Sequence, residues 1–100
     1  MTEFLLKFAN KQGFNVKYKP LQASDGRLKN NRIAIREGLP EEYQAYIIAH
    51  ELAHAYIHEG DTINSPLHSL YEKQADKIAI LLIDLLKFVE EKNMKEGGRR

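Results

Sequence analysis

The stretch His50-Glu51-Leu52-Ala53-His54 constrains this chain more than any other part of the sequence. It lies among small and apolar residues, which predicts a buried helix. Two histidines four residues apart lie one helical turn from each other, so both imidazoles can bind one ion from the same helix face. Glu51 projects about 100° further round the helix, where it can contact a water on that ion without being a ligand. This arrangement is typical of catalytic zinc sites.

The alternative interpretation is a structural domain without metal, in which these polar residues only serve the packing of the helix. Burying His50, Glu51 and His54 is costly unless each side chain is paired, so we favour a metal site. The sequence contains no cysteine, and the ligands must therefore be nitrogen and oxygen atoms. Zinc is the expected metal, although manganese, iron and cobalt also accept such ligands.

The length of 100 residues suits one hydrophobic core, so we expect a single domain over residues 1–93 and a flexible tail over 94–100. A formal net charge of +1 gives no electrostatic reason to expect direct nucleic-acid binding. The N-terminus lacks the apolar region of a signal peptide, and the longest apolar run, residues 78–83, is too short to span a bilayer. We expect a cytoplasmic protein that does not engage a membrane.

The first part of the chain predicts one helix and a small sheet. Thr2 is suited to cap the helix and Gly13 to end it. The apolar stripe of this helix would consist of Phe4, Leu5, Phe8 and Ala9. Alternation of apolar and polar residues predicts strands at 14–18 and 32–36, with a weaker one at 27–30. We expect an antiparallel sheet of two or three strands.

The second part predicts two helices. Pro40 suits the first position of a helix that contains the histidine pair and runs to His58. A long C-terminal helix would start between Ser65 and Ser69 and end near Lys92. Its core stripe would consist of Ile78, Leu81, Leu82, Leu85, Phe88 and Val89. The predicted fold class is therefore α+β.

A catalytic zinc site needs a third protein ligand. Glu72 is the first choice, because Glu72 and Asp76 are two carboxylates four residues apart on one helix face. Glu72 would bind the metal while Asp76 hydrogen-bonds the far nitrogen of a ligand histidine. His68 and a site without a third protein ligand are the two alternatives. Residues 69–72 also form a capping box, in which Glu72 would return to the backbone of Ser69.

The stretch from Tyr46 to His58, followed by residues 72–79, resembles the ImmA/IrrE metallopeptidase family. The hallmark of that family is a HELGH-like helix followed by an E-x-x-A-N/D-x-F-A segment. Family members also carry a short strand just before the helix, for which residues 33–35 are suited. The resemblance extends from about residue 33 to residue 82.

This resemblance implies a minimal zincin-like catalytic domain. His50, His54 and Glu72 would then be zinc ligands, Glu51 the general base, and Asp76 a residue that orients a ligand. The substrate would be a protein, typically a transcriptional regulator such as the repressor of a phage or other mobile element.

The sequence departs from the family pattern at a few positions. Ala53 replaces the usual glycine of the helix, and Ile78 stands where the family tends to have phenylalanine. Residues 82–84 replace a Leu-Met-Pro that often ends the segment, so the last helix should continue.

Two questions about the chemistry stay open at this level. Stabilisation of a developing oxyanion needs a second electrophile, which Tyr56, Tyr71 or His68 could supply. A chain this small also leaves open a zinc-containing module that binds a regulator without cleaving it.

Overall fold

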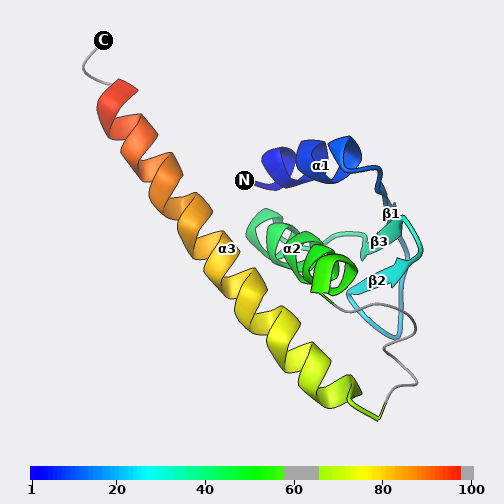
Figure 1. Cartoon of the computed structure of the whole chain (residues 1–100). Coiled ribbons are helices and arrows are strands. Elements are labelled where there is room, and N and C mark those ends of the chain that lie inside the picture. Colours follow the sequence, from blue (N-terminus) through cyan, green and yellow to red (C-terminus); the bar gives the residue numbers. More distant parts are fainter. Residues whose placement is uncertain (58–65, 98–100) are drawn as a thin grey trace.

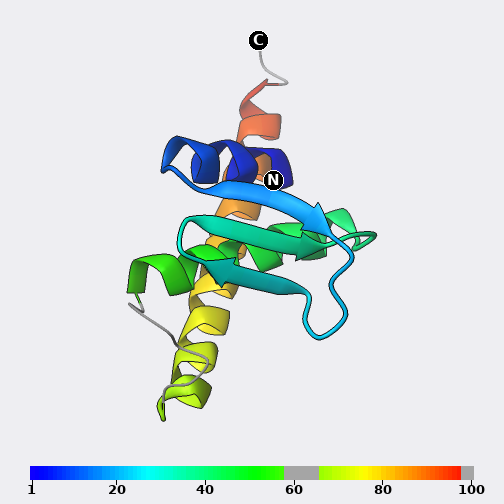
Figure 2. The ribbon, with the colours of Figure 1, turned by 90° about the vertical axis from the view of Figure 1, so that its right-hand side faces the viewer.

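The computed structural model describes residues 1–57 and 66–97 of the chain (Figure 1). Its elements follow the order α1 (Thr2–Lys11), β1 (Asn15–Lys19), β2 (Gly26–Lys29), β3 (Arg32–Arg36), α2 (Glu41–Ile57) and α3 (His68–Gly97). The expected α+β class is confirmed. Figure 2 shows the sheet in front of α2, with α3 behind them. Within the described ranges, no helix is both long and apolar enough to cross a membrane.

Helix α2 is the central element of the fold. It contacts α1, β2, β3 and α3, whereas α3 packs, among the described elements, against α2 alone. Apolar side chains are buried almost all round α2, namely Ala45, Ile47, Ile48, Ala49, Leu52 and Ala53. Neighbours on several sides therefore fix the position of this helix and of the histidines it carries. It begins one residue after the expected Pro40, and the expected end at His58 lies outside the described residues.

The sheet is mixed, so the expected antiparallel arrangement was wrong for one of its two strand pairs. β2 pairs antiparallel with β3, and β1 pairs parallel with β3. The strand order is β1-β3-β2, because the segment after β1 carries the chain to the far edge and a turn at Asn30-Asn31 returns it to the centre. Asn30 has a φ of 54°, in the left-handed region that asparagine tolerates. Alternation within each strand does not determine this order.

Helix α1 differs from expectation in its cap and its buried face. Its N-cap is Met1, which forms no side-chain cap bond. Thr2 is instead buried, and its hydroxyl donates to the carbonyl oxygen of Glu41 at 2.8 Å. This bond ties α1 to the start of α2. Of the expected apolar stripe, Leu5 and Ala9 are buried, whereas both phenylalanines are exposed.

The expected core stripe of α3 was also largely wrong. The helix packs on α2 with Ala75, Ala79 and Ile83, which are buried. Among the expected core residues, Leu81, Leu85, Phe88 and Val89 are exposed. Small side chains line the contact because they let the two helix backbones approach closely. The helix also continues to Gly97, beyond the expected end near residue 92.

Candidate metal centre

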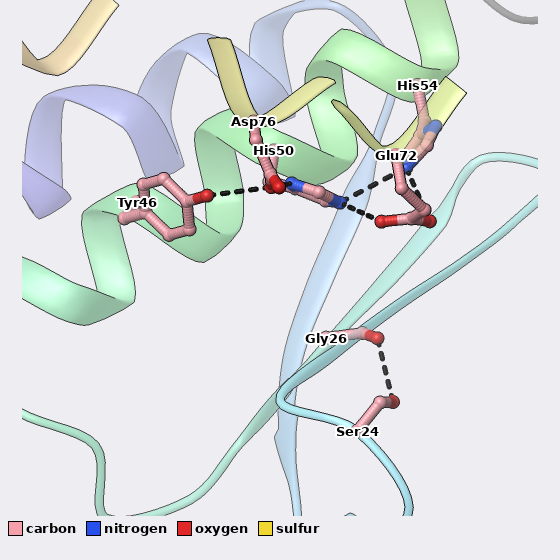
Figure 3. Close-up of polar contacts among 7 residues, drawn as sticks. All are labelled: Ser24, Gly26, Tyr46, His50, His54, Glu72 and Asp76. Atoms are coloured by element: carbon pink, nitrogen blue, oxygen red, sulfur yellow. Dashed lines mark hydrogen bonds and ion pairs between the residues drawn. The ribbon is translucent and has the colours of Figure 1, made fainter. Parts of the chain in front are cut away.

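Four polar side chains meet where α2 and α3 face each other (Figure 3). His50 and His54 come from successive turns of α2, and Glu72 and Asp76 from successive turns of α3. The buried residues Ala75 and Ala79 hold this part of α3 against α2. The cluster therefore depends on close contact between the two helices.

Three of these side chains converge on one point. His50 Nε2 lies 3.0 Å from Glu72 Oε2, and His54 Nε2 lies 3.1 Å from Glu72 Oε1. The two Nε2 atoms are 3.1 Å apart. Tetrahedral zinc, with bonds of about 2.0–2.1 Å, separates its ligand atoms by about 3.3 Å. The observed spacing thus fits a bound metal ion after a small expansion, and these three residues could hold one.

The charges at this point also fit a metal ion. His50 Nδ1 lies 2.8 Å from Asp76 Oδ1, although the two atoms are not aligned for a straight hydrogen bond. A carboxylate on this side favours the His50 tautomer with its proton on Nδ1, which leaves the Nε2 lone pair facing Glu72. Two imidazole nitrogens and a carboxylate about 3 Å apart are stabilised by a cation or a proton shared between them. The donor set is therefore suited to a cation.

The exposure of the three side chains makes the site accessible from one side. The His50 and His54 side chains are 12% and 6% exposed, whereas that of Glu72 is 40% exposed. The helices thus enclose the imidazoles, and solvent reaches the carboxylate. A catalytic metal site needs such an open position for water.

A hydrogen bond from Tyr46 holds Asp76, the residue that contacts His50. Tyr46 donates its hydroxyl proton to Asp76 Oδ1 at 2.7 Å. Burial and this bond raise the pKa of Tyr46, so it remains a neutral donor at neutral pH. Tyr46 was not among the residues predicted for the site. Its place one turn before His50 on the same helix face was the signal that could have found it.

Glu51 lies in α2 between the two histidines and is 7% exposed. Burial raises the pKa of Glu51 to about 7, a change that His50 opposes and Glu72 reinforces. Its side chain packs against the backbone of β2 at Gly26. A Cβ added to Gly26 would lie 2.5 Å from Ile47 Cγ2 and 3.1 Å from Glu51 Oε2. The sequence pattern did not predict this close approach.

The structure does not bring all the predicted site residues together. Tyr56 is exposed and packs edge-to-face on Phe14, with ring centroids 6.0 Å apart. His68 is the first residue of α3, one turn before Glu72, and is not among the three residues that could hold a metal. Tyr71 directly precedes Glu72 on the same helix.

The capping-box alternative for Glu72 was wrong. Helix α3 starts at His68, so Ser69 lies within the helix and is not its N-cap. The Glu72 carboxylate points instead to the two histidines (Figure 3).

A hollow of about 380 Å³ lies near the start of α2 and is lined by Pro40, Glu42, Tyr43, Tyr46 and Ile83. Tyr43 stacks on Tyr46, with ring centroids 5.8 Å apart, and donates to Asp25 Oδ2 at 2.8 Å. Because Tyr46 also bonds Asp76, one residue connects this apolar hollow to the cluster of His50, His54, Glu72 and Asp76.

A helix-borne pair of histidines that meets a glutamate from a second helix points to a metallopeptidase. The family model described as the IrrE N-terminal-like domain, peptidase family M78, matches residues 9–91. The chain therefore belongs to this family of metallopeptidases, which confirms the resemblance to ImmA/IrrE proteins. None of the curated proteins matches the sequence significantly.

The chain is also similar to a solved structure, the metallopeptidase zymogen of Pyrococcus abyssi abylysin. The two share 24% sequence identity with a TM-score of 0.49, over 87% of this chain and 96% of that chain.

Proposed function

We propose that this chain is a zinc-dependent peptidase in which His50, His54 and Glu72 hold the metal and Glu51 is the general base. The observation that carries the proposal is the convergence of two imidazole nitrogens and one carboxylate within 3.0–3.1 Å of each other. The buried carboxylate of Glu51 lies on the same helix between the two histidines. The cluster supplies ligands, an accessible side and a base.

Bound zinc would act as a Lewis acid towards a peptide carbonyl and would lower the pKa of a water molecule towards neutrality. Glu51 would take a proton from that water and return it to the leaving amine. Burial raises the pKa of the Glu51 carboxyl, so it holds a proton near neutral pH more readily than an exposed carboxyl does. Asp76 would hold His50 in the tautomer and orientation that a ligand needs, with Tyr46 fixing Asp76 in turn.

Stabilisation of the developing oxyanion is the remaining chemical task. His68 lies one turn before Glu72 on the same helix face, which supports it as the donor. Tyr71 is the second candidate. Tyr56 is the third, because its ring packs on Phe14.

The substrate of a peptidase is a protein, and we propose a transcriptional regulator of the same cytoplasm, such as the repressor of a phage or other mobile element. The resemblance to the ImmA/IrrE family supports this substrate class. The apolar hollow beside Tyr46 is suited to a substrate side chain close to the site of cleavage.

Peptide cleavage tests the proposal most directly. Zinc-loaded wild type and Glu51→Gln would be incubated with a library of peptides from a digested proteome, and the new termini identified by mass spectrometry. We expect cleavage by the wild type and a loss of about 10²–10⁴-fold in the variant, which should keep its zinc. Equal cleavage by both proteins would contradict the role of Glu51. Zinc binding without cleavage by the wild type would favour the alternative, a module that binds a regulator without cutting it.

A further inference from the structure

Helix α3 carries a row of large apolar side chains on the side that α2 does not cover. Leu81, Leu85 and Phe88 are 69%, 56% and 62% exposed. They follow each other at spacings of four and three residues, and the partly exposed Ile78 continues the row one turn earlier. Spacings of three and four residues place side chains along one seam of a helix, as in coiled coils. We call Ile78, Leu81, Leu85 and Phe88 the α3 stripe.

The stripe is exposed because it lies on the side of α3 that faces away from α2, although α2 runs beside this part of the helix and bonds Asp76 through Tyr46 and Lys87 through Glu42. The 30 residues of α3 extend about 45 Å, whereas the 17 residues of α2 extend about 25 Å. In Figure 1 the last turns of α3, coloured red, run past the end of α2. The buried residues of α3, such as Ala79 and Ile83, lie on another side of the helix. Contiguous exposed apolar residues of this kind mark interaction surfaces.

We propose that the α3 stripe is the interface of a homodimer, in which α3 packs antiparallel against α3 of a second copy. Leu81 of each copy would lie opposite Leu85 of the other, and Ile78 opposite Phe88. Every residue of the stripe then meets an apolar partner. The arrangement has two-fold symmetry, so the same surface of both copies forms the interface.

The charges beside the stripe favour this antiparallel register. Lys77 and Glu91 are both exposed and flank opposite ends of the stripe. In the proposed register Lys77 of one copy faces Glu91 of the other, and symmetry repeats the pair. A parallel arrangement would instead place Lys77 beside the apolar Leu82 of the other copy, so that the pair with Glu91 would not form. Oppositely charged residues flanking the seam set the orientation of helix pairs in this way.

One charge opposes the dimer. Asp84 is exposed on the same flank, midway between Lys77 and Glu91, and would face Asp84 of the second copy near the symmetry axis. This repulsion limits the strength of the dimer. It also makes a distinctive prediction, because removal of the charge should strengthen self-association.

The dimer would leave the metal-binding cluster open. Leu81 projects from α3 about half a turn round the helix from Glu72, so the stripe and the cluster lie on opposite sides of α3. The proposal therefore depends neither on zinc nor on peptidase activity, and its test does not use either.

Sedimentation equilibrium of the full chain over a wide concentration range tests this interface. We expect reversible formation of dimers in the wild type and monomers for Leu81→Glu. Ile80→Glu is the matched control, because Ile80 is also exposed on α3 but lies outside the stripe. This variant should dimerise as the wild type does. Circular dichroism would check that each variant is folded.

Three further variants test the register. Lys77→Glu should weaken the dimer on the order of tenfold, and adding Glu91→Lys to it should restore the affinity. Asp84→Asn should strengthen the dimer several-fold. A wild type that stays monomeric at all concentrations would overturn the proposal. The same result is expected if a different protein covers the stripe, so that case also counts against the homodimer. A dimer that Leu81→Glu leaves intact, or that the charge exchange does not restore, would overturn it too.

Discussion

At the scale of single residues, the site depends on the chain of contacts that runs from Tyr46 through Asp76 to His50. Tyr46 fixes the Asp76 carboxylate, and that carboxylate lies 2.8 Å from His50 Nδ1. The far nitrogen of His50 is thereby directed to Glu72. In the proposed metal centre, residues that touch no metal would thus determine how well His50 is presented to the ion.

Replacement of Asp76 tests this chain of contacts. We expect Asp76→Ala to lower zinc affinity about 10–100-fold, because His50 loses the group that fixes its tautomer and orientation. Tyr46→Phe should have a smaller effect, since Asp76 remains. Competition with a chelator of known affinity would measure both. Asp84→Ala is the control, because Asp84 is exposed on the same helix away from the site. Unchanged affinity in Asp76→Ala would contradict the positioning role.

A second residue-scale prediction concerns Gly26. The added methyl group of Gly26→Ala would lie 2.5 Å from Ile47 Cγ2, on the buried side of α2. We expect a loss of about 1–3 kcal/mol in the free energy of unfolding, measured with urea, because neither backbone can easily move away. The exposed Ser24, whose hydroxyl donates to the Gly26 carbonyl oxygen at 2.9 Å, provides the control. Ser24→Ala should stay within about 0.5 kcal/mol of the wild type. Equal stability of both variants would show that β2 can withdraw from α2.

The residues of the cluster could be predicted from the sequence, whereas most of the contacts that surround them could not. His50, His54, Glu72 and Asp76 could be found because helical spacing places them on common faces. The contact of Gly26 with Glu51 could not be predicted, because it joins a strand and a helix whose packing is set by the whole fold. Whether Glu72 was free to bind a metal or formed a capping box depended on which residue begins α3. The local sequence defines the start of a helix poorly.

At the scale of elements, the contact between α2 and α3 decides whether the site exists. Ala79 is fully buried between the helices, one turn beyond Asp76. We expect Ala79→Leu to separate the helices, lower the free energy of unfolding by about 1–3 kcal/mol and weaken zinc binding. Thermal unfolding and chelator competition would measure the two effects. Lys73→Leu, at an exposed position of the same helix, is the control. Undiminished zinc binding by Ala79→Leu would contradict the dependence of the site on this contact.

The packing of the helices and strands against one another could not be predicted from the sequence. Apolar residues occupy most of the circumference of α3, so a helical projection could not tell which of them face α2. The larger side chains indicated the wrong face, because alanines line the actual contact. In the sheet, the alternation identified β3 with its correct bounds, but not the parallel pairing of β1.

At the scale of the whole molecule, metal binding and folding should be coupled. The proposed ligands come from α2 and α3, which come together only in the folded chain. A ligand that binds only the folded state at 100 times its Kd raises the free energy of unfolding by about 2.7 kcal/mol. We expect zinc to stabilise the wild type by this order of magnitude and to leave Glu72→Ala almost unchanged. Urea titrations with zinc and with a chelator would measure the difference. Equal stabilisation of both proteins would place the bound zinc elsewhere.

The metal content of the protein tests the central claim most directly. Wild type, Glu72→Ala and Glu51→Gln would be purified without a histidine tag and analysed by mass spectrometry for bound metals. We predict about one zinc per chain in the wild type and in Glu51→Gln, and markedly less in Glu72→Ala, since zinc sites with only two protein ligands are uncommon. A wild type that holds no metal even after zinc is added, or a Glu72→Ala variant that holds as much as the wild type, would contradict the proposed centre.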